Sequence, residues 1–117
     1  MQFEKPCTVL LLGEMGAGKT TFVSEVVKRL CGAHVTSPTF GIINQYAPDI
    51  FHADLYRIRD AKELENTDFY EILYGDNIFF IEWPFNQVDP AAYAKCKRVV
   101  KVHIKVVNET EREFTFD

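Results

Sequence analysis

The stretch Gly13-Glu14-Met15-Gly16-Ala17-Gly18-Lys19-Thr20 follows directly after an apolar run, Thr8 to Leu12. It satisfies the pattern G-x-x-x-x-G-K-[ST], whose backbone N–H groups surround phosphates. The run before it is almost entirely apolar, as in strands covered on both faces. After it, apolar residues recur at helical spacing, at Phe22, Val23, Val26, Val27 and Leu30. Strand, glycine loop and helix together predict a phosphate-binding loop.

Each part of this loop has its own role in binding a nucleoside triphosphate. Glycine tolerates positive φ and has no Cβ, so the backbone can approach an anion closely at Gly13, Gly16 and Gly18. The unpaired N–H groups of the first helical turn, together with the helix dipole, favour a phosphate there. We expect Lys19 to reach the β- and γ-phosphates and the Thr20 hydroxyl to hold Mg²⁺. The alternative is a glycine-rich turn that binds nothing, with Lys19 merely solvated.

Two further strands are predicted to end in acidic residues. Residues 78–82 (Ile-Phe-Phe-Ile-Glu) describe a buried strand that delivers Glu82 to the carboxyl edge of the sheet, where ligands bind in open α/β sheets. Residues 50–55 describe another, with His52 and Asp54 on one face because strand side chains alternate. We expect Glu82 to hold Mg²⁺, directly or through a water, and Asp54 to reach magnesium or to polarise water. Glu82 could instead only mark the exit of its strand into solvent, and we interpret His52 as a structural histidine.

Residues 34–41 are predicted to form a loop, since they are rich in hydroxyl side chains and contain Pro38. In P-loop proteins the segment after the first helix is commonly a switch region that meets the γ-phosphate and its metal. Ser37 and Thr39 can therefore offer hydroxyls to a phosphate oxygen, the metal or the attacking water. The alternative is that both side chains only satisfy the backbone of a turn.

The rest of the chain predicts short elements without a linker or an internal repeat. We expect strands over residues 42–47, 50–55, 78–82 and 99–107, a returning strand over 113–117, and helices over 61–66 and 69–74, with a further helical turn that begins at Pro90. These elements indicate one P-loop ATPase domain over residues 1–117. Its class is α/β: a mixed, mostly parallel central sheet flanked by helices, with a C-terminal β-hairpin.

Composition argues against several classes of function. The net charge of −4 and the pI of about 5.3 disfavour unaided nucleic-acid binding, because the lysines and arginines are scattered. We interpret the one basic cluster (Lys95, Lys97, Arg98 and Lys101) as the solvated edge of a strand. No apolar run approaches the roughly 20 residues that span a bilayer, and the 3 cysteines form no C-x-x-C pair. We therefore expect a cytoplasmic protein that docks on another protein and binds neither membrane nor DNA.

The order of the motifs resembles the TsaE family, the small bacterial ATPases needed to make N6-threonylcarbamoyladenosine in tRNA. The P-loop by itself is generic. The specific part of the resemblance is the combination Ser37-Pro38-Thr39-Phe40, His52-Ala53-Asp54-Leu55-Tyr56-Arg57 and Ile81-Glu82-Trp83-Pro84. Together with the P-loop it covers Thr8 to about Phe85.

The resemblance implies a Mg²⁺-dependent ATPase that supports the TsaB–TsaD protein pair and reaches tRNA only indirectly, through that complex. It implies catalytic roles for Lys19, Asp54 and Glu82, with Thr20 and Glu82 as the metal ligands. It places Trp83 close to the site. The residues that it implies around ATP are Glu14, Met15, Gly16, Ala17, Gly18, Lys19, Thr20, Thr21, Ser37 and Thr39.

The resemblance leaves base recognition and the reaction class open. Family members usually carry a segment before the P-loop strand that contacts the base, whereas residues 1–7 precede the strand here. The hairpin turn around Glu111 and Arg112 is a second candidate for approaching the nucleotide. The rival functions are a small nucleotide or metabolite kinase and a non-hydrolysing nucleotide-sensing module. A small GTPase is disfavoured because the sequence contains no N-K-x-D motif.

Overall fold

The computed structural model describes residues 3–14, 16–32 and 42–117, and in this part of the chain it has a six-stranded sheet. The strand order is β2-β3-β4-β1-β5-β6. β3, β4, β1 and β5 run parallel, and β2 and β6 are antiparallel strands at the two edges. The strands are β1 (Cys7–Leu12), β2 (Ile43–Ala47), β3 (Ile50–Asp54), β4 (Ile78–Glu82), β5 (Val99–Val106) and β6 (Arg112–Phe116).

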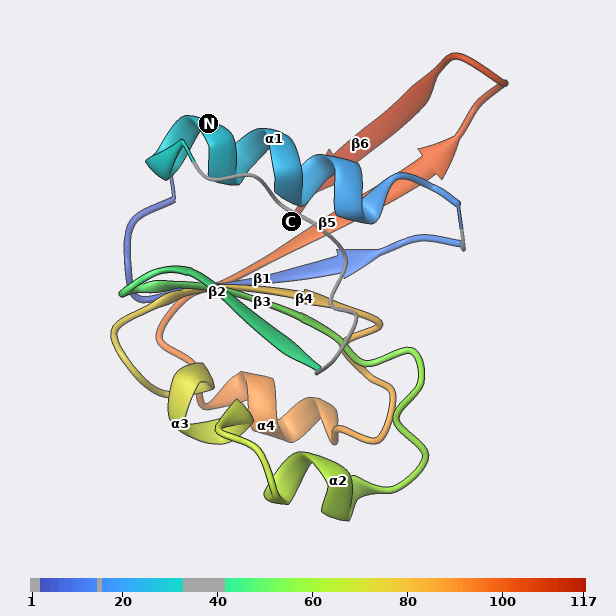
Figure 1. The fold of residues 1–117 in the computed structure, drawn as a ribbon. Helices are drawn as coiled ribbons and strands as arrows, with labels where there is room; N and C mark the ends of the chain where they lie inside the picture. Colours follow the sequence, from blue (N-terminus) through green and yellow to red (C-terminus); the bar gives the residue numbers. More distant parts are fainter. Residues whose placement is uncertain (1–2, 15, 33–41) are drawn as a thin grey trace.

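Helices cover both faces of the sheet (Figure 1). The P-loop helix α1 (Lys19–Cys31) lies on one face. Three short helices lie on the other: α2 (Ala61–Glu65), α3 (Phe69–Leu73) and α4 (Pro90–Ala94). The predicted class, an α/β fold with a mixed, mostly parallel sheet and a C-terminal β-hairpin, is therefore confirmed.

Alternation along the strands divides the buried residues into two apolar clusters. On what we call the α1 face, Val9, Leu11 and Phe80 pack with Val23 and Val27 of the helix. On what we call the α2–α4 face, the cluster contains Leu10, Ala53, Phe79 and Ile81 of the strands, with Leu64 and Phe69 of the helices. Adjacent residues of one strand thus belong to different cores, as the period of two requires.

Local capping explains where the helices begin and end. Gly18 precedes α1 with φ 100° and Gly32 follows it with φ 75°, both in the left-handed region that favours glycine. The side chain of Asp60 accepts a hydrogen bond from the N–H of Lys62 and so caps α2. The carboxylate of Glu63 accepts from the N–H of Arg59, one residue before the position that a capping box uses.

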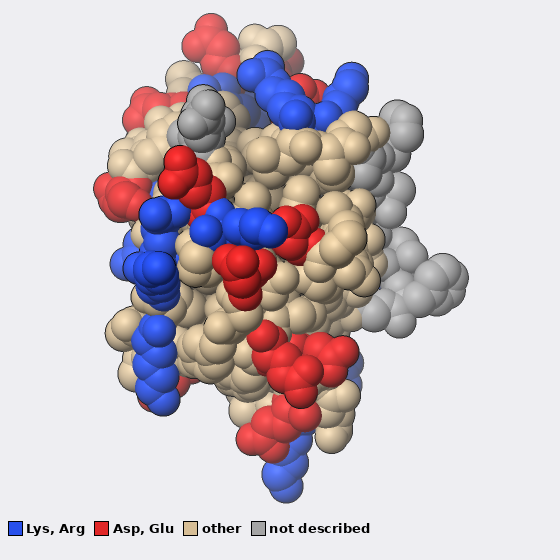
Figure 2. All heavy atoms as spheres, turned by 90° about the vertical axis from the view of Figure 1, so that its left-hand side faces the viewer, with Lys and Arg blue, Asp and Glu red and all other residues tan. Residues whose placement is uncertain are grey.

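The basic cluster does not lie at a sheet edge, which corrects our interpretation. β5 lies between β1 and β6, so β6 is the edge strand. Lys95, Arg98 and Lys101 are exposed. On the side of the molecule that lies at left in Figure 1, positive and negative side chains are interspersed (Figure 2).

Within the described residues, no helix is both long and apolar enough to cross a membrane.

Candidate functional site

The carboxyl ends of three parallel strands meet beside the P-loop. β1 runs directly into the glycine loop, and β4 lies between β1 and β3. The register aligns Glu82 with Leu11 on one side and with Asp54 on the other. The two acids that end β3 and β4 are therefore neighbours at the edge where the loop begins.

Lys19 is buried, with 5% of its surface exposed, and its amine is held inside the loop. Its Nζ donates to the carbonyl oxygens of Gly13 at 2.7 Å and Glu14 at 3.2 Å. The same atom lies 3.9 Å from the centre of the Trp83 ring, a cation–π contact. Burial lowers the pKa of Lys19, and the charges of Glu82 and Asp54 oppose that shift. The amine thus has partners that phosphate oxygens can replace.

Thr20 and Glu82 form the second element of the site. The Thr20 hydroxyl donates to Glu82, at 3.0 Å from Oε2 and 3.3 Å from Oε1. A hydroxyl and a carboxylate are hard oxygen donors, and Mg²⁺ keeps several waters and needs only one or two protein ligands. No cluster of three or more His, Cys, Asp or Glu that could hold a metal occurs among the described residues. The donor set fits a magnesium ion shared with phosphates.

Asp54 is half-buried beside this pair. Its Oδ1 accepts a hydrogen bond from the N–H of Tyr56 at 3.0 Å, which fixes the carboxylate against the turn that follows β3. Burial raises the pKa of Asp54, and the nearby charge of Glu82 raises it further, whereas the Tyr56 N–H, His52 and Lys19 lower it. A carboxylate with a raised pKa is a better proton acceptor.

Trp83 lies over the site because its backbone adopts an uncommon conformation. Its φ is 54°, in the left-handed region that a bulky residue seldom adopts. The conformation turns the chain between Glu82 and Pro84 and brings the indole over Lys19. The ring also packs on Tyr56, with ring centroids 5.1 Å apart. Such strain is typical of functional sites.

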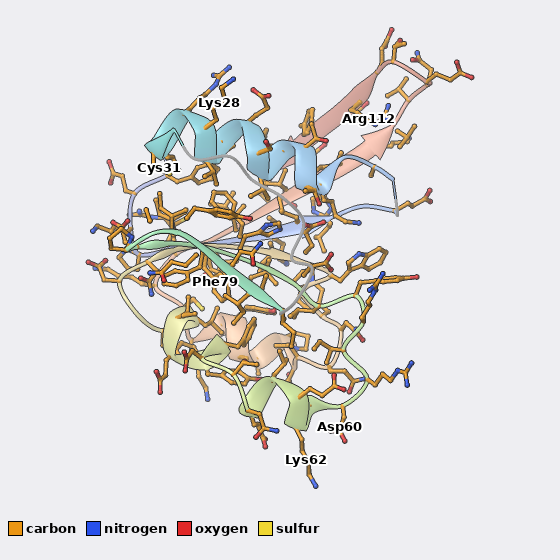
Figure 3. The ribbon with its side chains drawn as sticks, viewed as in Figure 1. Lys28, Cys31, Asp60, Lys62, Phe79 and Arg112 are labelled. Atoms are coloured by element: carbon orange, nitrogen blue, oxygen red, sulfur yellow. The ribbon has the colours of Figure 1, made fainter. Side chains whose placement is uncertain are left out.

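The β5–β6 hairpin reaches the other side of the P-loop. The Nε of Arg112 donates to the carbonyl oxygen of Ala17 at 3.2 Å, and Nη1 donates to the carbonyls of Asn108 and Glu111. Figure 3 shows Arg112 in the hairpin, beside the beginning of α1. Beside it is a cavity of about 360 Å³, lined by Gly18, Thr21 and the Phe114 ring, among others.

Four of the predicted residues come together: Lys19, Thr20, Asp54 and Glu82. Gly16 and Gly18 have positive φ, as a loop that surrounds phosphate needs. The predictions for Met15, Ser37 and Thr39 lie outside the described residues. Arg57 is exposed, and within the described residues no ion pair joins it to Asp54.

Sequence reasoning missed the contacts that depend on pairing between distant segments. His52 is fully buried, and its Nε2 lies 2.6 Å from Oε2 of Glu82. The family resemblance suggested that the hairpin turn at Arg112 approaches the nucleotide, but its hydrogen bond to Ala17, 95 positions away, was not predicted. For His52 a signal existed: the sequence places it on the same strand face as Asp54.

Sequence comparison finds similar proteins that share one description. The sequence model of the family described as "Threonylcarbamoyl adenosine biosynthesis protein TsaE" matches residues 1–114. A "tRNA threonylcarbamoyladenosine biosynthesis protein TsaE" from Rickettsia felis is 35% identical over 89% of this chain, which spans 61% of that relative. The protein of the same name from Haemophilus influenzae is 37% identical over 68% of this chain and 53% of its own length.

A solved structure has a similar fold. The crystal structure of YdiB from Bacillus subtilis aligns with a TM-score of 0.65 and 28% sequence identity. The alignment covers 97% of this chain and 70% of that protein. The chain spans between 45% and 76% of the length of the relatives that it matches.

Proposed function

Since this chain belongs to the TsaE family of threonylcarbamoyl adenosine biosynthesis proteins, we propose that it binds and hydrolyses ATP with Mg²⁺ in support of that tRNA modification. The observation that carries the proposal is the Thr20–Glu82 hydrogen bond of 3.0 Å, next to a buried Lys19 whose amine faces the P-loop. This is the arrangement that a P-loop ATPase needs around the β- and γ-phosphates.

In the binding step, the P-loop N–H groups and the beginning of α1 hold the triphosphate. Lys19 exchanges the carbonyl oxygens of Gly13 and Glu14 for phosphate oxygens, and its charge, desolvated by burial, acts strongly on them. Thr20 and Glu82 hold the magnesium ion. That ion, when bound, neutralises charge on the phosphates.

In the chemical step, a water attacks the γ-phosphorus in line, the new O–P bond forms and the bond to the β–γ bridging oxygen breaks. Asp54 orients this water and accepts its proton, which its raised pKa favours. Lys19 and the P-loop stabilise the charge on the transferring phosphoryl group. ADP and inorganic phosphate are the products.

The cavity beside the P-loop is where we place the nucleoside. It opens next to Gly18 and Thr21, at the end of the loop from which the α-phosphate would continue. Phe22 and Phe114, with ring centroids 5.8 Å apart, give it an aromatic wall on which a base can stack. Arg112 ties this wall to the P-loop through Ala17.

The partner that we propose is the TsaB–TsaD protein pair, with tRNA reached only through that complex. The exposed Arg57 does not complete the phosphate site by itself, so turnover by the isolated chain should be slow. The three cysteines are free thiols, which suits a reducing compartment such as the cytoplasm.

The direct test is ATP turnover by the purified chain, alone and with a TsaB–TsaD pair from the same source. We expect slow turnover alone and a clear increase with the pair. Lys19→Ala and Asp54→Ala should lose both, while Lys28→Ala and Asp68→Ala, at exposed positions, should not. Phosphate transfer to an added nucleoside or sugar would instead support a kinase, and ATP binding without turnover a sensing module.

The nucleoside placement has its own test, the affinity for ATP compared with that for inorganic triphosphate. Phe114→Ala should weaken ATP binding by about 10-fold, the lower part of the range for loss of one stacking contact. It should leave inorganic triphosphate binding unchanged, because the phosphates contact the P-loop alone. An equal loss for both ligands would contradict the placement.

A further inference from the structure

A chain of buried and half-buried polar groups runs from the edge strand β2 to the P-loop helix. Nδ2 of Asn44 donates to the Tyr46 hydroxyl at 3.4 Å, and that hydroxyl lies 3.4 Å from Nδ1 of His52. Nε2 of His52 lies 2.6 Å from Oε2 of Glu82, which also accepts from Thr20 at 3.0 Å. His52 is 0% exposed and Glu82 only 4% exposed.

The surroundings of His52 favour an apolar residue, so the presence of a polar imidazole at this buried position needs an explanation. It lies inside β3, in register with Phe80 of β4, on the face that packs against α1. Burying a polar ring costs free energy unless both nitrogens have partners. Here both do, and the shorter contact is to the carboxylate that we place on the metal.

The donors and acceptors of this chain require a hydrogen on Nε2 of the imidazole. An ionised carboxylate only accepts, so Nε2 of His52 carries the hydrogen that Glu82 receives. Nδ1 faces the Tyr46 hydroxyl, a group that can donate to it. Hydrogen bonds of this kind fix the orientation of a metal-binding group.

We propose that His52 is a positioning residue that orients the Glu82 carboxylate toward Thr20 and the metal. The inference rests on the proposed function for the identity of the metal, and on the hydrogen bonds alone for the positioning. With Nε2–H and Thr20 Oγ1 both donating to Oε2, the carboxylate has one preferred rotation. Without His52, Thr20 is the remaining hydrogen-bond donor to Glu82 among the described side chains, and the carboxylate can turn away from the metal.

The test compares the Mg²⁺ requirement of His52→Phe, His52→Gln and the unchanged protein. His52→Phe keeps a ring but removes the donor, and the Mg²⁺ concentration for half-maximal ATP turnover should rise about 10- to 100-fold. ATP binding in EDTA should change less than about twofold, because the P-loop contacts remain. His52→Gln places an amide N–H near the position of Nε2 and should restore most of the Mg²⁺ affinity.

Two controls separate positioning from simple damage to the fold. Phe51→Leu, on the other face of the same strand, should lower stability without changing the Mg²⁺ requirement. Tyr46→Phe removes only the hydroxyl of a half-buried ring, so it replaces His52→Phe if that variant does not fold. It should raise the Mg²⁺ requirement by about threefold, since loss of one hydrogen bond of ordinary strength has an effect of this order.

A measurement without metal or nucleotide tests the positioning independently of the ATPase proposal. In a long-range ¹H–¹⁵N NMR spectrum, His52 should be the Nε2–H tautomer, with that proton protected from exchange, and Glu82→Gln should change its shifts. Observation of the Nδ1–H tautomer would overturn the proposal. An unchanged Mg²⁺ requirement in His52→Phe, or no rescue by His52→Gln, would also overturn it. An absence of ATP binding in the unchanged protein, with the tautomer as expected, would count against the proposed function alone.

Discussion

The two faces of the sheet are built from the same strands, yet they differ in chemistry. Along β4, Phe79 and Ile81 enter a mainly apolar cluster on the α2–α4 face, whereas Phe80 and Glu82 lie on the α1 face. Along β3, Ala53 and His52 divide in the same way. One face is a conventional core. The other interrupts its core with buried polar groups, and these lie where the phosphate loop begins.

The difference between the two faces predicts which substitutions change stability and which change activity. Substitutions on the α2–α4 face act on the free energy of unfolding. Substitutions of polar groups on the α1 face should act on the proposed nucleotide chemistry and can even raise stability, since burying charge costs free energy. The predictions below test this separation, in order of decreasing free-energy effect.

Phe79→Ala should lower the free energy of unfolding by about 3–5 kcal/mol, because it opens a cavity in the α2–α4 core. Phe79 is 1% exposed and packs edge-on against Phe51 and at a tilt against Phe69, and Figure 3 shows it on the side of the sheet that carries the short helices. Urea unfolding measures the effect. At a temperature where the variant is folded, ATP turnover per folded molecule should stay within about twofold. A loss of turnover without a loss of stability would contradict the proposed difference between the two faces of the sheet.

Lys19→Ala should lower ATP turnover by about 100- to 1,000-fold, the usual effect of losing one transition-state contact. Its free energy of unfolding should change little or rise, because burial already lowers the pKa of this lysine and so penalises its charged form. Lys28→Ala is the matched control, since Lys28 lies on the exposed side of α1 (Figure 3). Turnover and urea unfolding would be measured on both. Equal effects of the two substitutions on turnover would contradict the placement of Lys19 in the nucleotide site.

Asp54→Asn should lower turnover by about 100-fold, because the amide cannot accept the proton of water. It should also make the protein more stable at pH 7, since burial raises the pKa of Asp54 above 3.8 and so disfavours its charged form. The stability that the neutral acid provides is present below pH 3.8 and is lost as the pH rises through the raised value.

Unfolding measurements at several pH values test this prediction for Asp54. The free energies of unfolding of the two proteins, measured in urea, should agree near pH 3 if both are folded. As the pH rises, the Asn variant should become more stable than the unchanged protein. Asp68→Asn, at an exposed position, should show no such divergence. A variant that loses turnover and is also less stable at pH 7 would mean that Asp54 holds the fold together.

Tyr93→Phe should lower the free energy of unfolding by about 1 kcal/mol, the net value of one hydrogen bond. The buried Tyr93 hydroxyl donates to the carbonyl oxygen of Pro84, and burial raises the pKa of this tyrosine. Turnover should remain within about twofold, since the hydroxyl lies on the α2–α4 side. Thermal unfolding and ATPase assays measure the two effects. A large loss of turnover would show that the two faces are coupled through Pro84.

Local patterns were sufficient for most of the fold and for the four central site residues. The glycine spacing, the helical period after Lys19 and the alternation that ends in Asp54 and Glu82 all act within a few residues, so they are visible in sequence. Strand order is not local. This is why the basic residues before and within β5 were wrongly assigned to a sheet edge.

The contacts that were not predicted also depend on non-local pairing. The His52–Glu82 bond joins residues 30 positions apart and depends on the pairing of β3 with β4. The contact of Arg112 with Ala17 depends on where the hairpin crosses α1. The resemblance placed Trp83 close to the site, but its contact with Lys19 was not predicted and accompanies the positive φ of Trp83. In each case the residue types were suggestive, and only the tertiary arrangement assigned their partners.

One measurement tests the central claim most directly: a titration of ¹⁵N-labelled protein with Mg·ATP, followed by backbone and side-chain NMR shifts. The claim is that one face and one edge of the sheet bind the nucleotide. Shifts should concentrate at Gly16, Gly18, Lys19 and Thr20 and at the Trp83 indole, and α2–α4 should be unaffected. Shifts confined to the cavity of about 290 Å³ lined by Cys7, Tyr74 and Arg98, or no shifts at all, would contradict it.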